Sequence, residues 1–183
     1  MGTTARNMMT GMLFPFLLAA CGQRQQALRE QVPVTEDTTF LTGTLFLVRH
    51  AEKNPGADST LTAAGMQRAG KLYRLLKDSS ISKIYSTKYK RTMQTGDSLR
   101  IRFGIDTVLY QPDSTGESLL YEISRRGDWG KRILVIGHSN TLIPLLKSLD
   151  VNPRMDSIAD KDYGNLFIVY KTRKGSKLVK QRY

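Results

Sequence analysis

The two histidines of the chain stand in similar surroundings. His50 comes two residues after the apolar run 44–48, and His138 comes two residues after the apolar run 132–136. Short continuous runs of Val, Ile, Leu and Phe are typical of buried parallel strands. The carboxyl ends of such strands meet at one edge of a sheet, where ligands bind, so both imidazoles are expected at that edge. A single histidine there is more often structural, whereas two of two favour catalysis.

Two arginines accompany these histidines. Arg49 directly precedes His50, and Arg91 stands at the start of an expected helix that follows the expected strand 83–86. A guanidinium presents a planar fork of donors that grips two phosphoryl oxygens and keeps its proton. Amides at a helix N-terminus also favour an anion. These groups together predict a receptor for a tetrahedral phosphoryl dianion.

Strands and helices alternate in the segment that must position these side chains. The expected strands are residues 44–48, 83–86, 107–110, 132–136, 166–170 and 178–180, and the expected helices are residues 63–76, 91–102, 118–126 and 141–149. Thr62 is the predicted N-cap of the first helix. This alternation predicts an α/β fold, with a three-layer arrangement in which helices cover both faces of a mainly parallel sheet.

Composition narrows the classes of chemistry. The 183 residues include 28 Lys and Arg against 16 Asp and Glu, with one cysteine and two histidines. A lone cysteine excludes an internal disulfide, and with two histidines it leaves no Cys/His zinc site. The chain has neither the Gly-x-Ser-x-Gly motif of serine hydrolases nor the Gly-x-x-x-x-Gly-Lys-Ser/Thr loop of P-loop proteins. The sequence therefore does not support either class.

The N-terminal residues predict a targeting signal. Residues 1–20 contain an apolar stretch that is too short to span a bilayer and is typical of a secretory signal peptide. The tetrapeptide Leu-Ala-Ala-Cys that ends at Cys21 resembles a bacterial lipobox, although an ordinary signal peptide or a buried helix remains an alternative. We therefore expect lipidation of Cys21, a lipid-anchored linker over residues 21–40 and a folded domain over residues 41–183. The expected location is the bacterial cell envelope, facing the periplasm.

Four motifs in order resemble those of the histidine phosphatase superfamily, also called the phosphoglycerate mutase-like family. The motifs are Arg49-His50-Ala51, with Ala where the family usually has Gly, Leu61-Thr62-Ala63-Ala64-Gly65, the stretch from Ser86 to Arg91-Thr92-Met93-Gln94-Thr95, and Gly137-His138-Ser139-Asn140. The resemblance covers roughly residues 45–149, and in particular it is to small bacterial phosphatases of the family.

The resemblance implies a phosphatase mechanism without a metal or another cofactor. His50 is the implied nucleophile, which forms a phosphohistidine that water then hydrolyses. Arg49, Arg91 and His138 are implied to line the phosphoryl oxygens and to supply the charge that a metal supplies elsewhere. The implied substrate-binding residues are Arg49, Arg91, His138, Lys53 and Ser139.

The general acid for the leaving group is ambiguous. Family members often use a Glu before the second histidine strand, and here that segment, residues 111–130, offers Glu117 first and Asp113 second. Glu52, in the loop after His50, is a third candidate. Each is equally consistent with a solvated carboxylate. Lys53 either contacts a substrate phosphate or is simply exposed.

The expected substrate is a phosphate monoester or phosphoramidate on a small molecule or a phosphoprotein. Two alternatives are phosphoglycerate mutase-type phosphotransfer and a non-catalytic binder of phosphorylated or polyanionic ligands. Residues 68–102 carry ten bases against two acids, and residues 171–183 carry six bases and no acid. For a lipid-anchored protein, anionic headgroups are the nearest partner for such patches. Nucleic acid is not an expected partner, because no recognition motif accompanies the charge.

Overall fold

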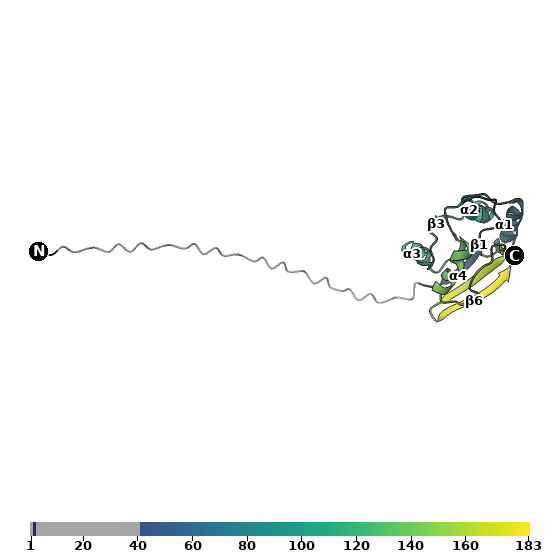
Figure 1. The fold of residues 1–183 in the computed structure, drawn as a ribbon. Helices are drawn as coiled ribbons and strands as arrows, with labels where there is room; N and C mark the ends of the chain where they lie inside the picture. Colours follow the sequence, from purple (N-terminus) through teal and green to yellow (C-terminus); the bar gives the residue numbers. More distant parts are fainter. Residues whose placement is uncertain (1, 3–40) are drawn as a thin grey trace. The chain divides into compact units, whose positions relative to one another are not determined.

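The structure is a computed structural model that describes Gly2 and residues 41–183 (Figure 1). The predicted signal peptide, the predicted linker and Cys21 lie outside the described residues. Within the described part of the chain, no helix has the length and apolar character needed to cross a membrane.

Six strands form one sheet in the order β3-β2-β4-β1-β5-β6. The strands are β1 (Gly43–Arg49), β2 (Lys83–Ser86), β3 (Thr107–Leu109), β4 (Arg132–Gly137), β5 (Asn165–Thr172) and β6 (Gly175–Arg182). The first four strands run parallel, whereas β5 is antiparallel to β1 and β6 is antiparallel to β5. The prediction of a mainly parallel sheet is confirmed, and the two late strands form a hairpin at its edge.

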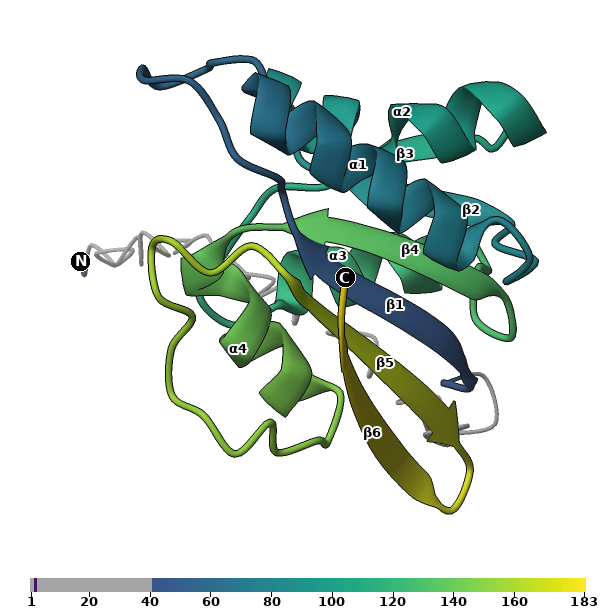
Figure 2. The same cartoon turned by 90° about the vertical axis from the view of Figure 1, so that its right-hand side faces the viewer.

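Four helices cover both faces of this sheet. They are α1 (Ala63–Leu76), α2 (Lys90–Phe103), α3 (Glu117–Arg125) and α4 (Ser139–Ser148). Figure 2 shows α1 and α2 on one side of the sheet and α4 on the other. Alternate residues of β1 point to opposite faces, so that Val48 packs in the cluster under α1 and α2, and Leu47 packs in the cluster under α3 and α4. The predicted three-layer α/β fold is confirmed.

The start of α4 differs from the expected position. We expected a helix over residues 141–149, but α4 begins at Ser139, directly after the end of β4. The backbone N–H of His138 donates to Thr141 Oγ1 over 3.2 Å, which closes the first turn immediately after the strand. Ser and Asn favour turns over helix interiors, and this preference concealed the earlier start. Pro144 consequently lies inside the helix rather than in its first turn.

The start of α1 is bound to the loop that follows His50. Thr62 caps the helix as predicted, because its Oγ1 accepts from the Gly65 N–H over 3.1 Å. The Thr62 N–H donates to the carbonyl oxygen of Glu52 over 2.9 Å. Gly65 lies so close to Glu52 that an added Cβ would collide with the same carbonyl. A glycine is therefore required where α1 meets this loop.

This contact distinguishes two glycines of the same helix. Gly65→Ala is expected to lower the free energy of unfolding by about 1–3 kcal/mol, because the new methyl group displaces the Glu52 backbone. Gly70→Ala is the matched control, since its Cβ would meet only the end of the Arg74 side chain at 3.6 Å. It should raise the free energy of unfolding by roughly 0.5–1 kcal/mol. Urea unfolding measures both, and equal effects of the two substitutions would contradict the close approach.

Candidate active site

The carboxyl ends of β1 and β4 bring the two histidines together. The His50 and His138 rings lie with their centroids 5.4 Å apart in an edge-to-face arrangement. Both side chains are buried, with 4% of His50 and 8% of His138 exposed. The parallel register of the two strands, in which Arg49 pairs with Gly137, produces this placement.

Of the two ring nitrogens of His50, only Nδ1 forms a hydrogen bond with the backbone of the described residues. Nδ1 lies 2.8 Å from the carbonyl oxygen of Ala51, and a carbonyl oxygen can only accept, so Nδ1 carries the proton. In the neutral ring Nε2 then holds the free lone pair. Burial lowers the pKa of His50 to about 4. The Ala51 hydrogen bond opposes this shift, and the charges of Arg91 and Arg49 add to it. His50 is therefore a neutral imidazole at pH 7.

His138 stands opposite at the N-cap of α4. Its Nε2 lies 3.0 Å from the hydroxyl oxygen of Thr87, which follows β2. Burial, together with the neighbouring His50, Arg91 and Arg49, lowers the pKa of His138 to about 3. A bound dianion would offset these positive neighbours and favour the protonated form. His138 is thus a group whose charge responds to ligand binding.

Arg49 is held on one side by a loop far away in the sequence. Its Nη1 donates to the carbonyl oxygens of Ala159 and Asp160 at 2.9 Å, and to that of Asp162 at 3.4 Å. Its guanidinium lies 4.1 Å from the centre of the Tyr163 ring. Its Nε is buried without a hydrogen-bond partner among the described residues. A buried donor without a partner is costly, and an oxyanion would satisfy it.

Arg91 is held in a similar way. Its Nη1 donates to the carbonyl oxygen of Ala57 over 2.7 Å, and its guanidinium lies 4.3 Å from the centre of the Tyr89 ring. The Tyr89 ring in turn meets the His138 ring edge-on at 5.3 Å. The Nε of Arg91 is likewise buried and has no partner in the part of the chain that the structure describes. Both guanidinium groups are therefore held in place, and each has an Nε–H donor without a hydrogen-bond partner in the described chain.

The motif that follows Arg91 holds the surrounding loops. The Thr95 hydroxyl donates to the carbonyl oxygen of Arg91 over 2.7 Å and accepts from the Ala51 N–H over 3.0 Å. The Gln94 side-chain oxygen accepts from the Leu61 N–H over 2.8 Å. These contacts explain why a polar motif occupies the start of α2, because its side chains fix the backbone next to His50.

A hollow of about 400 Å³ opens beside His138. The residues that line it are Tyr89, Arg91, Pro112, Asp113, Ser114, His138, Ser139, Asn140 and Thr141. This lining is mostly polar and includes Ser139, which was predicted to bind substrate. The hollow has the place and polarity expected for the part of a substrate that lies beyond its phosphoryl group.

The two acids of the segment before α3 are placed differently. Asp113 lines the hollow, and its carboxylate accepts from the backbone N–H groups of Thr115, Gly116 and Ser118. Burial alone would raise the pKa of Asp113, but these amide hydrogen bonds hold it below its ordinary value. Glu117 is the exposed first residue of α3 and is not among the residues that line the hollow. The structure therefore brings Asp113, as an anion, closer to the histidines than Glu117.

Glu52 and Lys53 are engaged in the loop after His50. Both carboxylate oxygens of Glu52 accept from Arg68 Nε, at 2.8 and 2.9 Å. Burial would raise the pKa of Glu52, but the hydrogen bonds and charge of Arg68 hold it below its ordinary value. Lys53 Nζ donates to the carbonyl oxygens of Asn54 and Gly56 within its own loop. Both side chains thus hold structure around the site.

Tyr163 is a residue of the site that no sequence motif indicates. Its ring lies 6.0 Å from the His50 ring and flanks the Arg49 guanidinium, so it contacts two of the predicted site residues. It belongs to an irregular segment between α4 and β5 that carries no motif or periodicity. The one available signal is general: loops at this edge of the sheet are expected to carry functional residues.

Comparisons with known proteins agree with this geometry. Residues 45–112 match the model of the histidine phosphatase superfamily (branch 1). A search of curated proteins finds no match. Among solved structures, the chain is similar to a candidate phosphohistidine phosphatase, SixA of Agrobacterium tumefaciens, with 19% identity and a TM-score of 0.60 over 76% of this chain and 98% of that one.

Two further solved structures show the same fold. The alpha-ribazole phosphatase of Shigella flexneri has 15% identity and a TM-score of 0.60, over 76% of this chain and 96% of that one. The phosphoserine phosphatase of Entamoeba histolytica, in complex with 3-phosphoglyceric acid, has 16% identity and a TM-score of 0.58, over 77% and 97%. These three similarities are similarities of fold, whereas the family model matches the amino-acid sequence of residues 45–112. Residues 45–112 therefore match the histidine phosphatase superfamily in sequence, and the chain shares its fold with these phosphatase structures.

Proposed function

We propose that this domain is a phosphatase that transfers a phosphoryl group first to His50 Nε2 and then to water. The observation that carries the proposal is a neutral imidazole with its Nε2 free, near enough to two arginines for their charges to lower its pKa. The buried Nε groups of these arginines have no partner among residues 41–183. Such a site attracts an anion and offers it a nucleophile.

The reaction proceeds by two displacements at phosphorus. In the first, His50 Nε2 forms a bond to phosphorus as the bond from phosphorus to the leaving atom breaks. In the second, water attacks phosphorus and the bond to Nε2 breaks, which regenerates the neutral imidazole and releases inorganic phosphate. Arg49, Arg91 and His138 donate to the phosphoryl oxygens in both steps, and no metal or cofactor takes part. Loss of one such preorganised donor typically costs about 10²–10³ in rate.

The carboxylates favour a particular kind of leaving group. Asp113 and Glu52 are both held as anions by their hydrogen-bond donors, so neither is suited to give up a proton near neutral pH. Glu117, the acid predicted first, stays a prediction. We therefore propose a substrate whose leaving group needs little protonation, such as an aryl phosphate or a phosphoramidate, carried by a small molecule or a phosphoprotein.

We also propose that the protein is a lipoprotein of the bacterial cell envelope that faces the periplasm. The support is the apolar stretch in residues 1–20 and the Leu-Ala-Ala-Cys tetrapeptide that ends at Cys21. In that setting the phosphatase domain would meet exported or extracellular phosphate compounds.

His50→Ala tests the nucleophile directly. Hydrolysis of p-nitrophenyl phosphate in the presence of EDTA should fall by about 10⁴-fold or more, because the covalent route is lost. Arg91→Ala should retain more activity, with a fall of roughly 10²–10³. Rapid quenching of wild type should trap a phosphoryl group that is stable in alkali and lost in acid, as phosphohistidine is. Activity that survives in the His50 variant would refute the mechanism, and transfer to an added hydroxyl acceptor in place of water would indicate a mutase.

The pH dependence of the imidazoles is a second test. In NMR titrations His50 should take up its proton near pH 4, and both rings should be neutral at pH 7. Because the folded-state pKa values lie below the ordinary 6.5, the unfolded chain binds more protons between pH 6.5 and 4. The stability contributed by these groups should therefore be complete above pH 6.5 and be lost as the pH falls toward 4. An apo-state ring that titrates near 6.5 would contradict the buried, neutral site.

The leaving-group preference is tested with matched substrates. Wild type should hydrolyse p-nitrophenyl phosphate much faster than glycerol phosphate, because the alkoxide needs a proton that the phenolate does not. Glu117→Gln and Asp113→Asn should change the ratio of the two rates by less than about tenfold, whereas loss of a working general acid costs about 10²–10⁴. A loss of that size for glycerol phosphate alone would identify the substituted residue as the acid.

A further inference from the structure

Unpaired positive charge gathers at the edge of the sheet opposite His50. The parallel strands begin at this edge, α1 and α2 end there, and the β5–β6 turn lies there because the end of β5 pairs with the start of β1. We call this surface the basic edge, and its exposed bases are Arg74, Arg102, Arg173, Lys174 and Lys177. None of these five forms an ion pair with another described residue.

The acids of the basic edge are already neutralised. Ion pairs join Lys77 to Asp78, Lys83 to Asp106, Lys131 to Asp128 and Lys171 to Asp150. The positive field of the five bases is therefore not cancelled locally. Free carboxylates occur instead around the opposite edge, where Glu117 is exposed.

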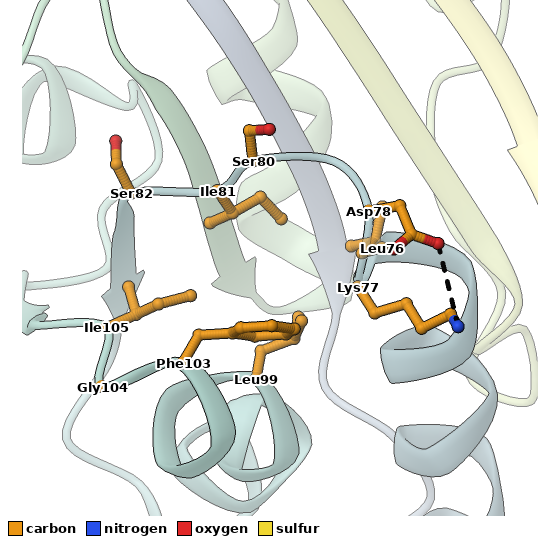
Figure 3. A pocket seen from close by; sticks show the side chains of 10 residues that line it. All are labelled: Leu76, Lys77, Asp78, Ser80, Ile81, Ser82, Leu99, Phe103, Gly104 and Ile105. Atoms are coloured by element: carbon orange, nitrogen blue, oxygen red, sulfur yellow. Dashed lines mark ion pairs between the residues drawn. The ribbon is translucent and has the colours of Figure 1, made fainter.

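Apolar side chains stand exposed among these bases. Ile101 is 67% exposed, Phe103 is 51% exposed and Leu75 is 43% exposed, all near the ends of α2 and α1. Figure 3 shows Phe103 and Leu99 beside a hollow of about 390 Å³ between the two helix ends, with the Lys77–Asp78 ion pair at its side. Exposed apolar side chains interspersed with bases are typical of surfaces that bind anionic membranes.

The point at which the chain enters the domain also favours an anionic membrane as the partner of this surface. β1 begins at Gly43, so the described chain enters the domain at the basic edge. Cys21, the proposed lipid-attachment site, stands about twenty residues before that entry in the sequence, so a lipid anchor would connect to the domain at this edge. Nucleic acid fits less well, because the phosphate backbone offers nothing to Ile101 and Leu75.

We propose that the basic edge docks on an anionic phospholipid surface. Bases within a Debye length of the headgroups supply the attraction, and the apolar side chains enter the interface. Seven residues of β1 separate this edge from His50, which places the site about 20 Å away on the aqueous side. The docked domain therefore keeps its substrate hollow open while it lies on the membrane.

Vesicle sedimentation tests this proposal with residues 22–183, which include both apolar cores and lack the lipid anchor. This chain should bind vesicles of equal parts phosphatidylcholine and phosphatidylglycerol, should not bind phosphatidylcholine alone, and should be released by high salt. The double variant Arg102→Glu, Arg173→Glu should weaken binding by more than about 30-fold, since each lost base near an anionic leaflet contributes roughly fivefold and each new carboxylate is repelled by the headgroups. Ile101→Ser should weaken binding without changing its salt dependence.

The matched control carries the same charge change near the opposite edge. Lys88→Glu, Lys161→Glu should bind the anionic vesicles far more tightly than the double variant of the basic edge. His50→Ala should bind as the parent does, so docking and the proposed phosphatase activity succeed or fail separately. Equal binding by the two double variants, binding to neutral vesicles, or retention by duplex DNA in place of vesicles would overturn the proposal.

Discussion

The backbone of residues 50–52 is the point on which the rest of the site depends. The His50 N–H donates to the Gly137 carbonyl over 3.0 Å, the Ala51 N–H donates to the Thr95 hydroxyl over 3.0 Å, and the Glu52 carbonyl accepts from the Thr62 N–H over 2.9 Å. These bonds join the turn after β1 to β4, α2 and α1 in succession. The Ala51 carbonyl, which is fixed by this turn, then selects the tautomer of His50. One constrained turn therefore sets both the position and the proton of the proposed nucleophile.

Positive charge is concentrated in the site, where neither Arg49 nor Arg91 forms an ion pair with a carboxylate of residues 41–183. Arg49 and Arg91 are held by backbone carbonyls and tyrosine rings, which orient a guanidinium but leave its charge intact. The two imidazoles remain neutral, because burial and the charges of these arginines lower their pKa values. A carboxylate partner would have bound the arginines more strongly and would have competed with phosphate. The two buried Nε donors without a partner in the described chain are the energetic cost of this arrangement, and in the proposed mechanism a bound phosphoryl group would offset that cost.

Much of this arrangement was readable from the sequence, because its determinants are local. Apolar runs set the four parallel strands, and the Thr62 cap and the helical periodicity set α1 to the residue. The sequence did not show which acids were already engaged, since the partner of Glu52 is Arg68, sixteen residues away on α1. Nor did it show Tyr163, whose loop is positioned by long-range contacts to Arg49. Contacts between distant segments were the part that only the fold supplied.

The parallel sheet also explains why the bases of this chain fall into two classes. A strand that delivers its last residues to the buried site begins at the opposite edge, about 20 Å away, so the two ends meet different surroundings. At the carboxyl edge, Arg49 is buried, Arg91 is partly buried, and both are held by carbonyls. At the other edge, Arg102 and Arg173 are exposed and have no ion-pair partner in the described chain. Charge of the first kind is fixed in place beside the histidines, as the proposed binding of one phosphoryl dianion requires. Charge of the second kind is spread along an edge, and it therefore suits a surface that is itself extended and anionic.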